Sequence, residues 1–341
     1  MTTDTQFQRV LAVDGGGSKT IAWVANVRSS SGRCSVELEI LGRGQAGPSN
    51  PRSVGFEVAL ANIDLALKAA REQASMDSSS IAVACLSLAG AGRIEEQNRV
   101  RAWADNRRLA MQTIVIDDVE PLRLAAMYEQ DLAPNAEKST WEQSVTLVVG
   151  TGSIACGRNE EHRSARVGGW GFLLGDEGSG FAIGMAGLRA ICHSYDRGEA
   201  TTPFQCALLK QLGLSNATEL VGIIYKTPLP RAQIAELSGT VLTHADRDPI
   251  AGKIRTDSID AMVQLVADTV RRLDLAHLSY SLALSGGILT NHSNIVDRLL
   301  IALERRQLLP SATHLVREPI HGPLLMAAQI LIGITLNSGA S

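Results

Sequence analysis

The chain has 341 residues, a length that suits two ordinary domains better than one. Hydrophobic residues make up 45% and charged residues 20%, so the chain can bury a core and remain soluble. Its net charge of −3 gives no electrostatic reason to bind nucleic acid or an anionic membrane surface. Residues 1–8 lack the pattern of a signal peptide, and the apolar segment 324–336 is too short to span a bilayer, so we expect a cytoplasmic protein.

The first half of the chain predicts a β-meander followed by alternating helices and strands. We expect strands at 9–13, 20–27 and 36–41, a helix from Phe56, a strand at 81–88, a helix from Arg93, a strand at 113–116 and a helix from Val119. The order is βββαβαβα.

The second half begins in the same way, with a strand at 145–149, a Gly/Ser/Thr turn and a returning strand from Ile154. A long amphipathic helix over 259–273, a strand at 282–284 and a last helix after Pro319 follow. The repeated strand–turn–strand pattern indicates an internal duplication, and the polar stretch 131–141 is our candidate for the crossing between two lobes.

Five cysteines are an odd number, and they are widely spaced with no C-x-x-C pair. This pattern favours reduced thiols over a disulfide framework or a zinc site. We expect all five to act as small buried hydrophobes. They are Cys34, Cys85, Cys156, Cys192 and Cys206.

The first candidate for chemistry is a glycine-rich turn between two predicted strands. Asp14 precedes three glycines, which let the backbone adopt φ > 0 and present N–H groups to an anion. Ser18 stands before Lys19 and a strand follows, so the segment is not a Walker A loop. By itself it is equally consistent with a phosphate grip and with an ordinary hairpin turn.

A second turn closes the matching strand of the second half, at Gly150-Thr151-Gly152-Ser153. With Ala155 it fits G-x-G-x-x-A, but residues 156–159 cannot begin a stable helix, so the dinucleotide fingerprint lacks its required context. Taken together, the two turns suggest two loops that clasp one polyphosphate.

Two acidic segments stand where α/β proteins place functional groups. Asp117 and Asp118 end a strand and begin a helix, so one carboxylate can cap the helix while the other accepts a substrate proton or holds Mg²⁺ through water. The segment 168–180 mixes glycines with apolar residues around Asp176 and Glu177, which suits a polyhydroxylated ligand. We expect one of these two acids to cap the helix that begins near Ser179.

Two weaker signals complete the search. Ser285-Gly286-Gly287 ends a strand, and it can be a tight turn or a place where a flat group such as adenine lies on bare backbone. His193 and His321 stand among apolar residues and are expected to be structural.

Taken in order, these motifs resemble the N-acetylglucosamine kinase family, part of the BadF/BadG/BcrA/BcrD-type ATPase group of the sugar kinase, Hsp70 and actin superfamily. The resemblance covers nearly the whole chain, and its specific part runs from Gly169-Trp170-Gly171 to Asp176-Glu177-Gly178-Ser179. It implies an α/β, two-lobed actin-like (ribonuclease H-like) fold in which each lobe has a βββαβα core. The first lobe would be 1–130 joined by the C-terminal helix at 321–341, and the second 131–320 with a helical insertion.

The resemblance also implies an ATP- and Mg²⁺-dependent kinase that transfers the γ-phosphoryl group to a hydroxyl, expected to be O6, of an amino sugar. Asp118 would be the catalytic base, and Asp14 would lie near Mg²⁺. The ATP phosphates would meet Gly16, Gly17, Ser18, Lys19, Thr20, Gly150, Thr151 and Gly152, and adenosine would meet Gly286 and Gly287. The sugar would meet Asn50, Asp118, Gly169, Trp170 and Asp176. A homodimer through the second lobe is also implied.

Two positions depart from the family pattern. Ile154 stands where the animal enzymes tend to have Asn, which bears on the contact to an N-acetyl group. Asp117 stands where Asn commonly precedes the base, and if both acids face the site, their coupling should raise the pKa of one of them.

Two other functions stay open at this point. An iron–sulfur ATPase that activates a partner enzyme would need cysteines in a setting that Cys192 and Cys206 lack. An inactive sugar-binding regulator would need no catalytic base. The sequence does not choose among glucosamine, N-acetylglucosamine and N-acetylmuramic acid.

Overall fold

The structure of the protein is a computed structural model, which describes residues 8–29, 36–76, 81–132, 141–226 and 230–333. The chain divides into two compact units, of which the first comprises Met1–Trp141 and Val316–Ser341 and the second Glu142–Leu315. The sequence analysis placed these boundaries after residues 130 and 320. Most of the expected crossing at 131–141 lies outside the described residues, as do Cys34 and the end of the last expected helix.

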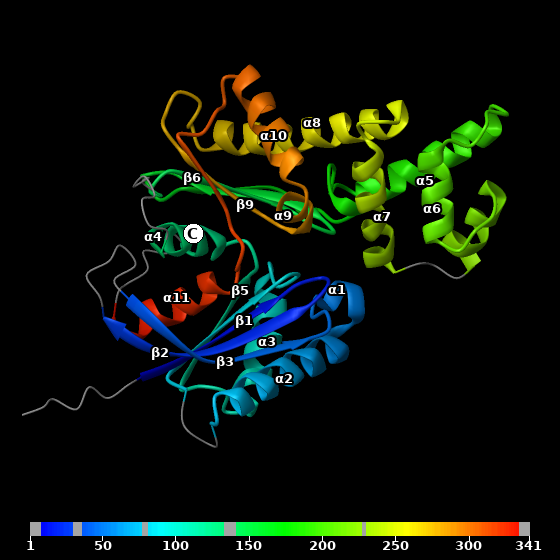
Figure 1. Cartoon of the computed structure of the whole chain (residues 1–341). Coiled ribbons are helices and arrows are strands. Elements are labelled where there is room, and N and C mark those ends of the chain that lie inside the picture. The colour runs from blue at the N-terminus through cyan, green and yellow to red at the C-terminus, as the bar shows by residue number, and fades with distance from the viewer. Residues whose placement is uncertain (1–7, 30–35, 77–80, 133–140, 227–229, 334–341) are drawn as a thin grey trace, which may run out of the picture. The chain divides into compact units, whose positions relative to one another are not determined.

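The first unit is built on a five-stranded mixed sheet in the order β3-β2-β1-β4-β5 (Figure 1). β1 (Gln8–Gly15), β2 (Thr20–Ser29) and β3 (Val36–Ala46) form an antiparallel meander, which confirms the predicted start of the chain. β4 (Val83–Leu88) and β5 (Gln112–Asp117) continue the sheet in parallel.

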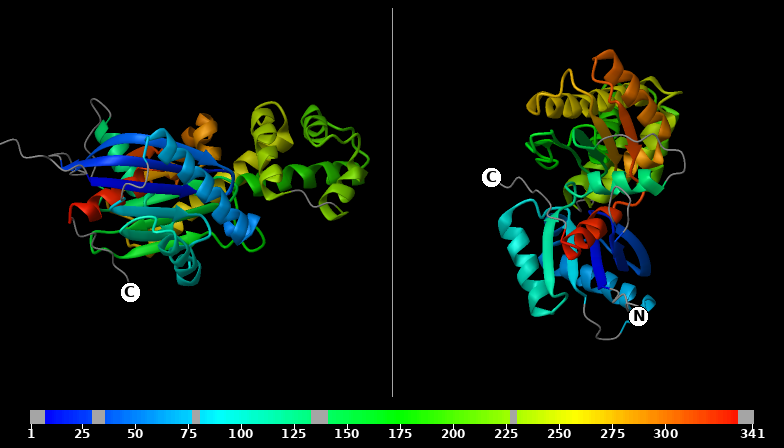
Figure 2. Two further views of the ribbon diagram at one scale, coloured as in Figure 1. Left: turned by 90° about the horizontal axis from the view of Figure 1, so that it is seen from below. Right: turned by 90° about the vertical axis from the view of Figure 1, so that its left-hand side faces the viewer.

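Helices cover both faces of this sheet, because β1 alternates two apolar sets. Leu11 and Val13 pack with α2 (Phe56–Gln73) and α3 (Ile94–Asn106). On the other face, Val10 and Ala12 pack with α4 and α11. These two helices span Leu122–Leu132 and His321–Leu331, and the short α1 spans Pro51–Val54. The last helix therefore returns to the first unit, and Figures 1 and 2 show α11 (red) beside β1.

The second unit repeats the topology of the first. β6 (Ser144–Val149), β7 (Ser153–Arg158) and β8 (Ser164–Gly168) form an antiparallel meander, and β9 (Ser281–Ser285) and β10 (Ala312–Leu315) extend it in parallel. Its order is β10-β9-β6-β7-β8. Read from β8 to β10, it places the third, second, first, fourth and fifth strands of the unit side by side, as in the first unit. The shared topology agrees with the interpretation of an internal duplication.

The helices of the second unit form two groups. α8 packs along the sheet, and α5, α6 and α7 pack together beside it (green to yellow in Figures 1 and 2). The α-helices are α5 (Gly180–Asp196), α6 (Pro203–Gln211), α7 (Arg231–His244), α8 (Pro249–Arg272), α9 (Gly287–Asn291) and α10 (Ser293–Arg305), with a 3₁₀ turn at Ala217–Glu219 and a π turn at Gly222–Lys226.

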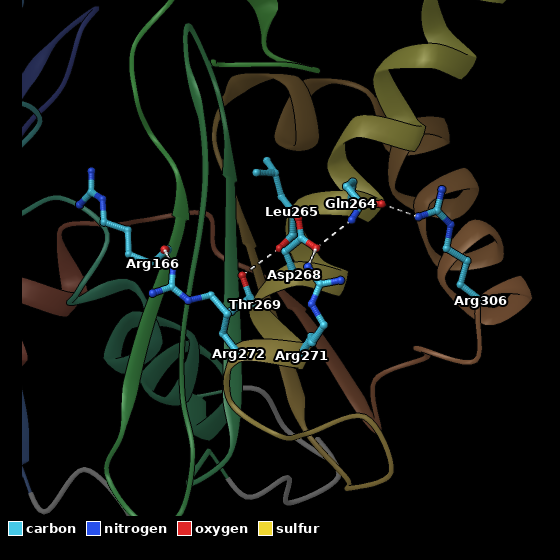
Figure 3. A network of polar contacts seen from close by, with 8 residues as sticks. All are labelled: Arg166, Gln264, Leu265, Asp268, Thr269, Arg271, Arg272 and Arg306. Atoms are coloured by element: carbon cyan, nitrogen blue, oxygen red, sulfur yellow. Dashed lines mark hydrogen bonds and ion pairs between the residues drawn. The ribbon is translucent and has the colours of Figure 1, made fainter. Parts of the chain in front are cut away.

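Polar contacts hold α8 to its neighbours (Figure 3). Arg272 Nη1 donates to the Arg166 carbonyl of β8 at 2.8 Å, and Arg306 Nη1, just after α10, donates to Gln264 Oε1 at 3.0 Å. Asp268 accepts from Arg271 Nη2 at 2.6 Å on the same helix. These contacts involve exposed side chains, so we expect each to contribute little to stability.

Some expectations about burial are wrong. Cys85 is buried as expected, Cys156 is only half-buried, and Cys192 on α5 and Cys206 on α6 are exposed. His193 on α5 is exposed as well. In contrast, His321 packs edge-on against Trp23 and fits the structural role expected of it. Within the described segments, no helix combines the length and apolarity needed to cross a membrane.

Candidate active site

Candidate residues of the first unit follow the carboxyl ends of three neighbouring parallel strands. The register pairs Gly15 with Leu88 and Leu88 with Asp117, so β1, β4 and β5 end at the same level. The glycine hairpin, the loop after Leu88 and Asp118 therefore leave the sheet at one edge, where α/β sheets bind ligands.

The hairpin between β1 and β2 is held against the end of β3. Gly16 N donates to Lys19 O at 2.9 Å, and Ser49 N donates to Gly16 O at 3.1 Å. A Cβ on Gly15 would lie 2.3 Å from Ser49 Oγ and 2.5 Å from Leu88 Cδ2, so a larger residue there would displace these side chains. The expected positive φ is wrong for the glycines at 15, 16 and 17, although the hairpin itself is confirmed.

Asp14 is half-buried and lies near the end of β1, between the buried residues Val13 and Gly15. Burial raises its pKa to about 6, the Lys19 ammonium opposes that rise, and the Glu318 carboxylate adds to it. A cation next to this carboxylate would favour its ionised form, so Asp14 is suited to a metal-bearing ligand.

Of the two roles expected of Asp117 and Asp118, capping is present in the structure. Asp117 Oδ1 accepts from the backbone N–H groups of Val119 at 2.8 Å and Glu120 at 3.2 Å. This turn occupies the residues where the sequence analysis began the helix, so α4 begins only at Leu122. Asp117 thus has the capping role, while the role of Asp118 as a base stays a prediction.

Asn50 lies next to the same edge of the first unit. Its side-chain oxygen accepts from Arg52 N at 3.0 Å and caps α1. That oxygen would lie 2.6 Å from a Cβ on Gly90, which follows β4 with φ 87°. The sequence analysis missed Gly90 and Ser49, and the Ala89-Gly90-Ala91-Gly92 run after a buried strand was the available signal for Gly90.

In the second unit, the turn 150–153 is tied to the start of α5. Gly150 N donates to Gly152 O at 2.9 Å, and the Gly150 carbonyl accepts from Gly180 N at 2.8 Å. The parallel register of β6 and β9 places Gly286 beside Val149, so the predicted adenosine glycines lie next to the predicted phosphate turn.

We expect Gly286→Ala to destabilise the protein by roughly 2–4 kcal/mol. Gly286 has φ 97°, and a Cβ there would lie 2.4 Å from the Val149 carbonyl oxygen, so the backbone must shift. Gly287→Ala is the matched control, since its nearest contact would be Asn291 Nδ2 at 3.7 Å. Urea unfolding checks this expectation, and equal stabilities of the two variants would contradict it.

The helix cap expected from Asp176 or Glu177 is wrong. Ser179 caps α5, because its side chain accepts from Ala182 N at 3.2 Å. Asp176 instead has φ 62° and is 4% exposed, and its Oδ1 accepts from Ser153 N at 3.3 Å. It therefore connects the segment 168–180 to the turn 150–153.

Asp176 has a cationic partner that the sequence analysis missed. Arg231 Nη2 at the start of α7 lies 3.4 Å from Asp176 Oδ2. Burial raises the pKa of Asp176, the Ser153 N–H and Arg231 lower it, and Glu177 raises it. No sequence pattern indicates the pair, because 55 positions separate the two residues.

The rest of the segment 168–180 is largely exposed and apolar. Trp170 is 73% exposed, and Leu173 and Leu174 are exposed as well. A Cβ on Gly169 would lie 2.7 Å from Ile154 Cδ1, so Ile154 packs against the backbone of the loop at that residue. The exposed indole of Trp170 suits stacking against one face of a sugar ring.

Comparisons with known proteins agree with each other. The BadF/BadG/BcrA/BcrD ATPase family model matches residues 11–307. An N-acetylmuramic acid/N-acetylglucosamine kinase from Clostridium acetobutylicum is 28% identical over 84% of this chain and 88% of its own. An N-acetyl-D-glucosamine kinase from Dictyostelium discoideum is 27% identical over 85% and 88%. A solved Chromobacterium violaceum structure, provisionally named N-acetylglucosamine kinase, superposes with a TM-score of 0.68 at 21% identity, over 95% of this chain and 99% of that one.

Proposed function

Because the chain belongs to the BadF/BadG/BcrA/BcrD ATPase family, with the two-lobed actin-like fold that the resemblance implied, we propose that it is an ATP-dependent kinase of amino sugars. The observation that carries the proposal is the common level at which β1, β4 and β5 end. It brings a glycine hairpin and the acids Asp14 and Asp118 to one sheet edge. A regulator that only binds sugar needs no such set.

The first unit would supply the proton acceptor and the metal-facing carboxylate. Asp118 would take the proton from the sugar hydroxyl, while the hairpin 16–20 would hold phosphate oxygens through backbone N–H groups and Lys19. Asp14 would hold Mg²⁺, directly or through water. Mg²⁺ neutralises phosphate charge in such reactions.

The donor set fits magnesium in this form. Among the described side chains, no cluster of three or more His, Cys, Asp or Glu is placed to hold a metal ion. Mg²⁺ commonly uses one or two carboxylates and completes its coordination with phosphate oxygens and water. The carboxylate of Asp14, whose pKa is raised to about 6 by burial, meets that need.

The second unit would supply the remaining binding groups. Its turn 150–152 would hold phosphate oxygens, and Gly286 and Gly287 would lie under adenosine. Gly169, Trp170 and Asp176 would meet the sugar, together with Asn50 of the first unit. The direct contact of Asp176 with Ser153 supports a role near both ligands.

N-acetylglucosamine is the substrate that we propose first, with O6 as the acceptor. Both curated relatives have N-acetylglucosamine in their names, and one also has N-acetylmuramic acid. A homodimer stays a prediction from the family resemblance.

The iron–sulfur alternative has less support. Cys192 and Cys206 lie on two different helices, α5 and α6, and both are exposed. An iron–sulfur cluster is held by several cysteine thiolates that converge on it.

A coupled assay of ADP release tests the proposed function. We expect release that depends on N-acetylglucosamine, with N-acetylmuramic acid and glucosamine as the informative comparisons and glucose as the control. Phosphorus NMR of the product would locate the phosphate. ATP hydrolysis that no sugar stimulates, or iron in anaerobically purified protein, would contradict the proposal.

A further inference from the structure

We propose that Arg231 is a positioning residue that fixes the Asp176 carboxylate against the turn 150–153, so that acceptor binding and the phosphate turn depend on one ion pair. This inference deepens the proposed function and rests on it for the identity of the two ligands. The ion pair itself is a property of the second unit alone.

The Asp176 carboxylate lies against the turn 150–153. Its oxygens would lie 3.0 and 3.1 Å from a Cβ on Gly152, so it lies directly against the turn. Ser153 N donates to one oxygen at 3.3 Å, and Ser153 Oγ donates to the Glu177 carbonyl at 2.7 Å. Any shift of Asp176 must therefore move this turn or break these bonds.

Keeping the buried Asp176 carboxylate charged has a cost. Asp176 is 4% exposed and has an αL backbone at φ 62°. Both features are costly unless the surroundings compensate. Among the groups that the structure describes, Arg231 on α7 is the cation that acts on it, Glu177 acts against it, and the turn 150–153 carries no titratable side chain.

Two aromatic rings lie near the Arg231 guanidinium. Its guanidinium carbon lies 4.5 Å from the ring centre of Phe172 and 5.9 Å from that of Phe181. The two rings contact each other edge to face at 5.1 Å between centroids. Phe172 belongs to the loop that carries Trp170, and Phe181 belongs to α5. Arg231 thus contacts the predicted sugar loop by stacking and the predicted phosphate turn through Asp176.

This arrangement predicts that the positive charge of Arg231 and its planar shape contribute separately to holding the Asp176 carboxylate in place. A lysine at position 231 keeps a cation near Asp176 but loses the planar stacking group. A glutamine loses the charge and leaves a buried carboxylate without its cationic partner, which raises the pKa of Asp176 further. The ionised form of Asp176 accepts the Ser153 N–H, so we expect activity to need this form. The acid limb of the pH profile of kcat/KM should therefore move to higher pH in Arg231→Gln.

The test compares Arg231→Gln, Arg231→Lys, Asp176→Asn and the double variant Asp176→Asn/Arg231→Gln. We expect Arg231→Gln to raise the KM for N-acetylglucosamine roughly 10- to 100-fold and to move the acid limb upward. Arg231→Lys should keep the acid limb of the pH profile near its wild-type position, but its KM for N-acetylglucosamine should lie between those of wild type and Arg231→Gln. The double variant should resemble Asp176→Asn, because the effect passes through Asp176.

Arg271→Gln is the matched control. Arg271 pairs with Asp268 on the exposed side of α8 in the same unit (Figure 3), and its loss should change the acceptor KM by less than about twofold. An unmoved acid limb in Arg231→Gln, or effects that simply add in the double variant, would overturn the inference.

Failure of the proposed function would be visible separately. If the wild-type protein phosphorylates no sugar, it can be compared with Arg231→Gln, Asp176→Asn and the double variant by thermal unfolding, which needs no substrate. Non-additive changes in Tm would still support the Arg231–Asp176 coupling, and additive changes would reject it.

Discussion

Asp118→Asn is expected to lower kcat by roughly 10²–10⁴-fold while ATP binding persists. The amide keeps the shape of the carboxylate but cannot accept the proton of the sugar hydroxyl. Asp118 directly follows the last residue of β5, whose end is level with the ends of β4 and β1. Steady-state rates together with nucleotide titration would separate loss of chemistry from loss of binding.

Asp117→Asn is the matched control for that substitution. Asp117 already accepts two backbone N–H groups, and asparagine caps such turns nearly as well as aspartate. We expect the variant to keep kcat within about threefold of wild type. A loss of kcat as large as that of Asp118→Asn would show that the two carboxylates share the catalytic role. Near-normal turnover in Asp118→Asn would show that Asp118 is not the catalytic base.

Asp14→Asn should change turnover and stability in opposite directions. Loss of the carboxylate that we assign to Mg²⁺ should lower kcat/KM for ATP by at least roughly 100-fold. The same change should stabilise the metal-free protein at pH 7.5, because burial raises the pKa of Asp14 from 3.8 to about 6. The gain is bounded at roughly 3 kcal/mol by the linkage between pKa and stability.

The pH dependence gives the sign of that effect. Because the folded pKa lies above the unfolded one, the contribution of Asp14 to stability is fully present below pH 3.8 and is lost as pH rises through about 6. The variant should therefore match wild type in acid and exceed it at neutral pH in urea unfolding without Mg²⁺.

Asp64→Asn in the same unit is the control for Asp14→Asn. Asp64 pairs with Arg107 at 2.8 Å, so its substitution should lower stability slightly at neutral pH. A wild-type protein that is as stable as Asp14→Asn at every pH would contradict the expected cost of the buried carboxylate.

The elements that the sequence predicted well are those with strong local signals. The period-two strands of both meanders, the amphipathic helix over 259–273 and the glycine turns after β1 and β6 are all present. Gly286 was predicted as part of a turn or of an adenosine site, but the sequence did not show that a Cβ there would meet the Val149 carbonyl, which makes glycine necessary. That requirement comes from a neighbouring strand far away in the chain.

The details of the candidate site were harder to predict from the sequence, because a short polar side chain can form a hydrogen bond with any of several nearby backbone groups. Asp117, rather than Asp118, caps the turn before α4, and Ser179, rather than either neighbouring acid, caps α5. In each case a hydrogen bond to a specific N–H decides the outcome, and its geometry depends on where the helix begins.

The sequence by itself determined the order of the elements in the first half, the repeated strand–turn–strand pattern and the family, because hydrophobic periodicity and glycine placement are properties of neighbouring residues. The tertiary structure decided what those segments contact. It placed Arg231 beside Asp176 across 55 residues and exposed Cys192 and Cys206. These outcomes depend on packing between distant segments, and no local pattern contains that information.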